Sequence, residues 1–298
     1  MVDTNGRAAQ ATAPVNVRYD RSALSYANSF DSPLRSRVIR TIEWMTGKIS
    51  VIRMIRQFER RGPYLGQEFW TTALDVLGVD ITTPEEQLAK IPQTGPVILV
   101  ANHPHGMVDG MVLAEIIGRR RLDYKILTRS LLTQIDTVAS QFLIAVPFPH
   151  HSDAQERMVE MRRKAMEQLK RGGMVALFPS GVVATSKTMF GPVVEEDWNV
   201  FTAKMIRNSG ATVVPCYFHG ANSRWYQMAH QISPTLRQSL LIHEIVRSKD
   251  TEFRPIIGDP ITPEDWSDRI SDPRQFMAWL REETLALGQR VGTGASPR

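Results

Sequence analysis

Short apolar runs alternate with helical stretches along most of this chain, and this alternation constrains the fold most strongly. The first run, Pro-Val-Ile-Leu-Val, occupies residues 96–100. Comparable runs lie at 124–127, 144–148, 174–178, 212–218 and 253–257. Helical periodicity is found at 67–77, 111–117, 131–142, 152–171, 200–208 and 273–287. Strands that alternate with helices predict an α/β fold, with a mostly parallel mixed sheet flanked by helices on both faces.

A basic helical segment precedes this alternating region. Residues 33–61 have the periodicity of a helix that Gly47 is expected to break, and Trp44 lies there among aliphatic residues and arginines. A basic, Trp-containing amphipathic helix is typical of a segment that lies on a membrane surface. The alternative is a helix that packs its apolar face on the core and leaves its arginines in water.

The chain therefore divides into four predicted parts. Residues 1–20 contain little to bury, so they are expected to form a disordered tail. Residues 21–90 form the basic amphipathic, membrane-associating segment, and 91–290 form the main domain. Residues 291–298 are expected to form a flexible tail.

Composition narrows the classes of protein to which the chain can belong. Of its 298 residues 22% are charged, and no apolar run approaches the ~18 residues needed to span a bilayer. Cys216 is the only cysteine, and the N-terminus lacks the apolar core of a secretion signal, so we expect a cytoplasmic protein. The net charge of +5 suits an anionic membrane, a nucleic acid or an acidic protein. Because the arginines interleave with aliphatic rather than aromatic residues, no nucleic-acid partner is expected.

The segment after the first apolar run carries the strongest chemical signal. Asn102, His103, His105 and Asp109 follow the strand end at Val100, and α/β proteins place their chemistry at such strand ends. A histidine beside a carboxylate can activate a hydroxyl near neutral pH. His103 is the preferred base and His105 is the competing one. The same residues also offer metal-ligand types, but no second cluster is evident downstream, so no metal is expected.

Three more loops follow predicted strands. The first is Phe178-Pro179-Ser180-Gly181, and the second runs from Pro215 to Asn222 and Arg224. The third covers residues 146–151. If the strands are parallel neighbours, their carboxyl ends open onto one crevice.

These motifs, in this order, resemble a known family. Asn-His followed by Asp, then Phe-Pro-x-Gly, then a strand ending in Val-Pro, is similar to the glycerolipid (lysophospholipid) acyltransferases over residues 90–260. That family commonly has four residues between its His and Asp, whereas five separate His103 from Asp109. The longer spacing resembles the bacterial branch that includes lyso-ornithine-lipid acyltransferases and hemolysin-like proteins. The resemblance identifies residues 91–290 as an acyltransferase domain.

The resemblance also implies a mechanism. His103 would act as general base on an acceptor hydroxyl, and Asp109 would orient the imidazole. The hydroxyl would attack an acyl thioester directly, with acyl-acyl carrier protein or acyl-coenzyme A as co-substrate and no other cofactor. The expected substrate-binding residues are Asn102, Phe178, Pro179, Ser180, Gly181, Pro215, Asn222 and Arg224.

Two departures from the family pattern bear on the acceptor. The Phe-Pro-x-Gly motif usually carries Glu at x, where this chain has Ser180, and residues 144–151 lack the arginine of another family block. A role that rests on the family's Glu cannot be carried over to Ser180, and the missing arginine favours a lyso-lipid such as lyso-ornithine lipid over lysophosphatidic acid. A 1-acylglycerol-3-phosphate acyltransferase that makes phosphatidic acid is one alternative, and a non-catalytic lipid-binding protein is another. The expected place of action is the cytoplasmic face of the inner (plasma) membrane, as a peripheral protein on anionic lipid.

Overall fold

The core of the fold is a six-stranded sheet, seen in a computed structural model that describes residues 25, 27, 32–62, 64–129, 137–147 and 153–292. The strand order is β10-β8-β2-β5-β3-β4, and every neighbouring pair is parallel except β10 with β8. These strands are β2 (Val97–Ala101), β3 (Tyr124–Arg129), β4 (Leu143–Val146), β5 (Met174–Leu177), β8 (Thr212–Tyr217) and β10 (Ile256–Ile257). The predicted α/β fold with a mostly parallel mixed sheet is confirmed.

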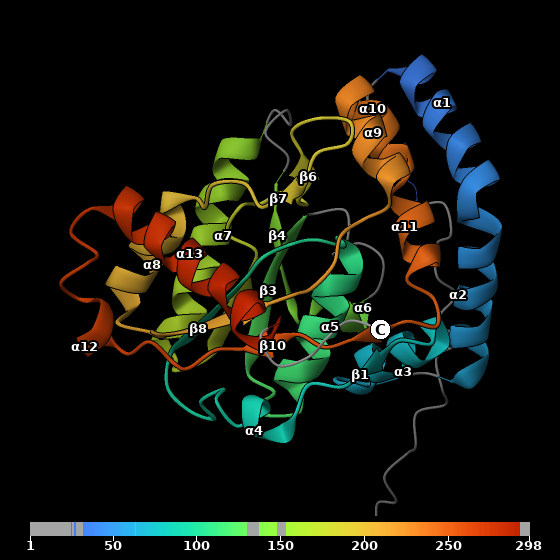
Figure 1. The fold of residues 1–298 in the computed structure, drawn as a ribbon. Coiled ribbons are helices and arrows are strands. Elements are labelled where there is room, and N and C mark those ends of the chain that lie inside the picture. The colour runs from blue at the N-terminus through green and yellow to red at the C-terminus, as the bar shows by residue number, and fades with distance from the viewer. Residues whose placement is uncertain are drawn as a thin grey trace, which may run out of the picture.

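Helices cover both faces of this sheet, so its central strands are buried on both sides (Figure 1). Along β2, Val97 and Leu99 belong to one apolar cluster and Ile98 and Val100 to the other, as the two-residue period of a strand requires. The first cluster includes residues of α3 (Glu68–Leu77) and α5 (Met107–Gly118). The second includes residues of α7 (Ala154–Lys170), α8 (Val200–Ser209) and α13 (Pro273–Gly292). This double burial explains why the strands are continuous apolar runs in the sequence.

The N-terminal segment is helical, as predicted, and bends at the predicted place. It consists of α1 (Pro33–Glu43), a π-helical turn (Trp44–Lys48) and α2 (Ile49–Arg61). Gly47 leaves helical geometry inside the π-helical turn. Phe58 of α2 packs edge-on against Phe69 of α3, with ring centroids 5.2 Å apart, which anchors the segment to the domain. Among the described helices, none has the length and apolarity needed to cross a bilayer.

Three further helices, which the periodicity did not predict, lie beside this segment (Figure 1). They are α9 (Arg224–Ile232), α10 (Pro234–Ser239) and α11 (Leu241–Arg247). Helix α10 packs between α1 and α9, and α11 packs on the π-helical turn. A side chain at position 47 would come within 3.0 Å of Val246, so glycine there allows α11 to approach closely.

The remaining elements are short. They are α4 (Glu85–Leu88), α6 (Thr137–Ser140) and α12 (Pro263–Trp266), with two small strand pairs. One pair joins β1 (Asp80–Ile81) to β9 (Glu252–Phe253), and the other joins β6 (Thr185–Ser186) to β7 (Val193–Val194).

Some predicted boundaries are wrong. The predicted strand 253–257 is two strands in different sheets, because Arg254 and Pro255 interrupt it. The final helix continues to Gly292, so the predicted 291–298 tail begins inside it. The predicted tail 1–20, the first half of the predicted helix 131–142 and the end of the 146–151 loop lie outside the described residues.

Candidate active site

The loop between β2 and α5 brings together the two residues predicted to carry the chemistry. His103 Nδ1 lies 3.0 Å from Asp109 Oδ2. Helix α5 begins at Met107 instead of the predicted 111, so Asp109 lies in its first turn and not on the loop. Gly106 ends the loop with a φ of +84°, a conformation that glycine adopts without strain. The earlier start fixes the carboxylate on a rigid element.

Asp109 is fully buried and accepts four hydrogen bonds. Besides His103, its partners are the ring Nδ1 of His105 at 2.9 Å, the backbone N–H of His105 at 2.8 Å and the backbone N–H of Gly106 at 3.1 Å. Burial alone would raise the pKa of Asp109, but the hydrogen bonds and charges of the two histidines outweigh it and lower that pKa. The helix N-terminus also favours a negative group at this position. The carboxylate is therefore held as an anion between two imidazoles.

The two histidines share Asp109 but have different surroundings. His103 stacks on Phe178, with ring centroids 3.9 Å apart and an interplanar angle of 16°. His105 packs edge-on against Phe253, and a side chain at Gly220 would come within 2.8 Å of His105 Nε2. The outer nitrogen of His105 thus faces the backbone after β8, whereas among the described residues none hydrogen-bonds to Nε2 of His103.

The Phe178–Gly181 loop joins the site through a carboxylate that the sequence analysis missed. Glu195 is buried, and its Oε2 accepts the backbone N–H of His103 at 3.1 Å while its Oε1 accepts the indole N–H of Trp198 at 3.1 Å. Burial raises the pKa of Glu195, and hydrogen bonds from His103, Ser180 and Trp198 oppose that rise. A carboxylate from residue 195 thus contacts Ser180, which occupies the position of the family's usual Glu. The serine at a position where the family usually has Glu was the one sign in the sequence that another residue supplies the carboxylate.

The β8 end of the site is held by two asparagines that were predicted to bind substrate. Asn102 donates to the carbonyl of Phe218 at 2.9 Å and accepts its N–H at 2.7 Å, so its amide fastens the two loops together. The backbone N–H of Asn222 donates to Pro104 at 3.2 Å. Nδ2 of Asn222 is buried without a hydrogen-bond partner among the described residues. A buried unpaired donor costs about 1–3 kcal/mol, which makes a ligand atom a favourable partner for it.

The other predicted binding residues lie at different distances from this centre. Pro215 is buried inside β8 opposite Val100, so the structure does not bring it into the loop cluster. Arg224 is exposed at the start of α9 and donates to the carbonyl of Gly191 at 2.8 Å. Arg129, at the end of β3, was not predicted, yet it donates to the carbonyl of Gly181 at 3.0 Å. Arg129 thus adds a cation beside the Phe178–Gly181 loop, from a strand whose end was not predicted to belong to the site.

Comparison with known proteins gives this geometry its context. The sequence matches the family profile described as "Acyltransferase" over residues 29–261. This chain belongs to the acyltransferase family. A lyso-glycine lipid O-acyltransferase of Phocaeicola vulgatus is 24% identical over 231 residues, which cover 75% of this acyltransferase and 78% of the relative. A lyso-glycine lipid O-acyltransferase of Bacteroides thetaiotaomicron is 25% identical over 235 residues, with 75% and 80% coverage.

A solved structure has a similar fold. The 1-acyl-sn-glycerophosphate (LPA) acyltransferase PlsC of Thermotoga maritima matches with a TM-score of 0.50 and 17% identity, covering 91% of this acyltransferase and 87% of that chain. This likeness supports the α/β architecture described above.

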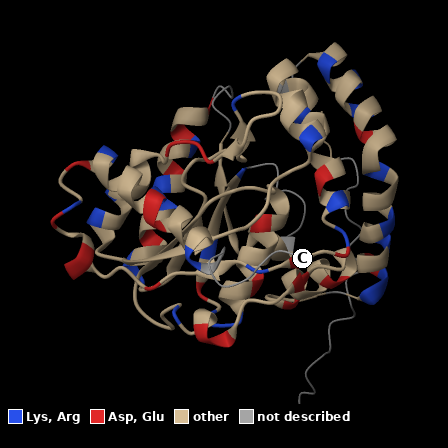
Figure 2. Cartoon of the chain, in the orientation of Figure 1, with Lys and Arg blue, Asp and Glu red and all other residues tan. Residues whose placement is uncertain are grey.

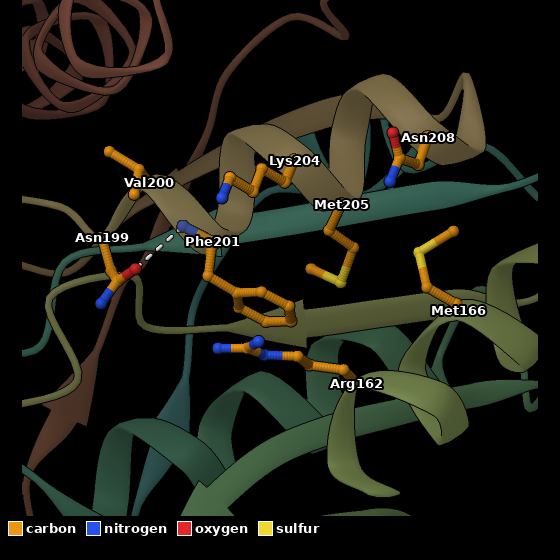
Figure 3. Close-up of a pocket in the computed structure, with 8 residues that line it drawn as sticks. All are labelled: Arg162, Met166, Asn199, Val200, Phe201, Lys204, Met205 and Asn208. Carbon is orange, nitrogen blue, oxygen red and sulfur yellow. Dashed lines mark hydrogen bonds between the residues drawn. The ribbon is translucent and has the colours of Figure 1, made fainter. Parts of the chain in front are cut away.

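The acyltransferase also has a cavity of about 260 Å³ on the opposite side of the sheet from α5, between α7 and α8 (Figure 3). Phe201 and Met205 line it, and the Arg162 guanidinium lies 5.4 Å from the centre of the Phe201 ring. None of the predicted site residues lines this cavity. Within the described ranges, no group of three or more His, Cys, Asp or Glu side chains is arranged to hold a metal ion.

Proposed function

We propose that this acyltransferase moves a fatty acyl chain from an acyl thioester to the hydroxyl of a lyso-lipid whose head group is an amino acid, such as a lyso-ornithine or lyso-glycine lipid. The observation that carries the proposal is the His103–Asp109 pair, in which Nδ1 is engaged by a buried carboxylate and Nε2 is left without a described partner. The names of the relatives from P. vulgatus and B. thetaiotaomicron support the lyso-lipid class.

The reaction follows from this pairing. With its Nδ1 proton directed at Asp109, the imidazole of His103 presents a lone pair on Nε2. Nε2 takes the proton of the acceptor hydroxyl as the hydroxyl oxygen attacks the thioester carbonyl. The C–S bond then breaks, the ester forms, and the thiolate leaves with the proton that the imidazolium returns. Cys216 takes no part, because it is fully buried and burial raises the pKa of its thiol.

Two groups of the site suit an amino-acid head group. The guanidinium of Arg129, which reaches Gly181, can pair with the head-group carboxylate through charge-assisted hydrogen bonds. Nδ2 of Asn222 can donate to a second oxygen of the lipid or to the oxyanion that forms at the thioester carbonyl.

The acceptor would be met at a membrane. Helices α1 and α2 carry Arg37, Arg40, Arg53 and Arg56 among aliphatic residues, and each well-placed basic residue adds about 1 kcal/mol of attraction to anionic lipid. We place the protein on the cytoplasmic face of the inner membrane, where acyl carrier protein and coenzyme A thioesters are available as donors. Vesicle flotation at rising salt tests this: binding should weaken as salt screens the charges.

The decisive experiment compares two matched variants in an acyl-transfer assay. In both His103→Asn and His105→Asn, the new amide can still donate to Asp109, but the outer ring nitrogen is removed. We expect His103→Asn to lower turnover about 10²–10⁴-fold, the usual contribution of a general base, and His105→Asn to lower it much less.

The donors are labelled acyl-acyl carrier protein and acyl-coenzyme A. The acceptors are lyso-ornithine lipid, lyso-glycine lipid and lysophosphatidic acid, and the products are separated by chromatography. Product from lysophosphatidic acid alone would replace the proposed acceptor. Equal activity in the His103→Asn variant would remove His103 as the base, and no product from any pair would favour a lipid-binding protein. Loss of activity on chelation would favour the metal alternative.

A further inference from the structure

The β6–β7 turn and α9 expose large apolar side chains to solvent. Phe190, at the turn, is 78% exposed, and Met189 beside it is also exposed. On α9, Trp225 is 68% exposed and Ile232 is 64% exposed, and half-buried Met228 lies between them. These three positions are spaced i, i+3 and i+7, so they form one stripe along the helix. Exposed apolar groups that gather in this way mark a contact surface.

Hydrogen bonds join the turn and the helix into one unit. Arg224 donates to the carbonyl of Gly191 at 2.8 Å. The N–H of Ser186 donates to Gln227 at 2.9 Å, and Gln231 donates to the carbonyl of Ser186 at 2.6 Å. Because the two elements are fastened at several points, their apolar side chains are presented together. We refer to residues 185–194 and 219–243 as the turn–α9 surface.

The charged residues that belong to this surface are all basic, and exposed Glu196 borders it and acts on His230 through its charge. Residues 185–194 and 219–243 contain no Asp or Glu, whereas they contain Lys187, Arg224 and Arg237. The chain as a whole has 31 acidic residues, so such acid-free stretches are a local property. Figure 2 shows the neighbouring α1 and α2 with blue positions along their length. Glu43, the last residue of α1, is fully buried, and Glu59 of α2 is half-buried.

The surface lies beside the candidate active site. The segment that leads into the β6–β7 turn contacts His103 at two points. Phe178 stacks on the His103 ring, and the backbone N–H of Ala184 donates to the carbonyl of His103 at 2.8 Å. Helix α10 packs between α9 and α1, which makes the turn–α9 surface continuous with the N-terminal helices (Figure 1). Apart from Leu65, Leu122 and Val159, all exposed large apolar side chains of the described residues lie on α1–α2, on the turn–α9 surface or at Val182 before it.

We propose that the turn–α9 surface is a second membrane contact, which docks on an anionic lipid bilayer and holds the mouth of the active site against it. Interleaved basic and aromatic residues without acids match the interface of such a bilayer, where aromatic rings enter the head-group layer and cations meet phosphates. The inference rests on the proposed function in one respect, since an acceptor that is a membrane lipid enters from the bilayer. It adds that a second contact, on α9 and the β6–β7 turn, lies beside the contact made by α1–α2.

A single fluorescent label tests the contact directly. Cys216 is fully buried, and burial raises the pKa of its thiol, so a maleimide dye reacts with an introduced surface cysteine. The dye is attached to Phe190→Cys and, as a control, to Asp268→Cys beyond α12, at the far end of the molecule from α1 (Figure 1). With vesicles of phosphatidylglycerol and phosphatidylcholine, the dye of Phe190→Cys should shift its emission to the blue and be quenched by lipids brominated in the acyl chains. The dye of Asp268→Cys should not change.

The inference is wrong if both dyes remain in water while the protein floats with the vesicles, or if the protein does not float. A blue shift that depends on protein concentration without lipid would indicate a second copy of the chain, and it would also overturn the inference. Acyl transfer in detergent is measured separately. If transfer is absent while the dye of Phe190→Cys enters lipid, the proposed function fails and the membrane contact stands.

A matched pair of double variants measures the contribution of the surface. Phe190→Ser with Trp225→Ser should lower partition into the vesicles about tenfold or more, since each aromatic ring contributes apolar burial. Leu122→Ser with Val159→Ser removes exposed apolar groups of similar exposure elsewhere and should leave partition unchanged. Both pairs should keep their transfer activity on detergent-dispersed lipids. Equal partition of the two pairs would contradict the assignment.

Discussion

Replacing Asp109 with asparagine isolates the charge of the buried carboxylate from its geometry. Oδ2 of Asp109 accepts the backbone N–H groups of His105 and Gly106, neither of which can become an acceptor. In Asp109→Asn, the side-chain oxygen therefore takes this position, and it remains an acceptor for His103 Nδ1. The amide NH₂ takes the other position and faces the ring of His105. His103 thus keeps its orientation and tautomer and loses only the negative charge beside it.

The size of the effect follows from the distance. His103 Nδ1 and Asp109 Oδ2 are 3.0 Å apart, and delocalisation over the ring and the carboxylate places the charge centres about 4 Å apart. Two unit charges at that separation interact by about 4 kcal/mol at an effective dielectric constant of ~20. The imidazolium exists only while the hydroxyl proton is on His103, so this attraction stabilises the transition state more than the ground state. We expect turnover to fall about 10²–10³-fold, since each 1.36 kcal/mol is a factor of ten.

Steady-state acyl transfer, with thermal unfolding as the folding control, measures this effect. Asp109→Ala serves as the contrasting variant: it leaves the backbone donors of His105 and Gly106 buried without an acceptor, at about 1–3 kcal/mol each, and should also destabilise the fold. Near-normal turnover in a folded Asp109→Asn variant would refute the reasoning, because it would show that the carboxylate charge does not stabilise the reacting imidazole.

Three further predictions concern the groups around this pair. Glu195→Gln should lower the unfolding free energy by about 1–3 kcal/mol in urea titrations. Its new NH₂ group must face a donor, which is either the backbone N–H of His103 or the indole N–H of Trp198. Unchanged stability would mean that those hydrogen bonds are dispensable. Asn222→Leu removes a buried donor that has no described partner. It should lower acyl transfer at least about tenfold with little change in melting temperature. Unchanged acyl transfer with a lower melting temperature would assign Asn222 a structural role. The depressed pKa of Asp109 stabilises the folded state above the unfolded-state value near 4, and this stability is lost as pH falls through the folded pKa. Asp109→Asn should therefore lose less unfolding free energy between pH 6 and pH 3 than the parent protein, and parallel curves would contradict this.

The sheet could be predicted from sequence because its strands are buried on both faces. β2, β5 and β8 are short apolar runs, and runs that are buried on both faces favour parallel pairing under helices. Helix α7 could also be predicted, because helical periodicity over a long segment is not compatible with a strand or a loop. The helices between Arg224 and Arg247 were missed because Ser233 and Pro234 divide them into short pieces with apolar residues on several sides.

The site was predictable only where its parts lie close together in the sequence. His103 and Asp109 are six residues apart, so the strand end and the following helix alone bring them together. Glu195 reaches His103 across 92 residues, and no local pattern encodes that contact. The start of α5 was misplaced because helical periodicity was evident only from residue 111, whereas the loop already ends at Gly106, which has a positive φ. The role of Arg129 depends on β3 lying next to β5, which only the strand order reveals.

The amide of Asn102 gives the molecule an order of assembly during synthesis. The segment with His103 and Asp109 is synthesised early, together with β2 and α5. The hydrogen bonds of Asn102 that hold the loop form only after Phe218, 116 residues later, has been synthesised. Glu195 must likewise emerge before the backbone of His103 is fixed. Contacts between such distant residues form slowly, because a long loop must close first. A nascent chain that ends before β8 therefore carries the complete motif without the active geometry, and competence for acyl transfer arises only when the second half of the sheet has joined the first.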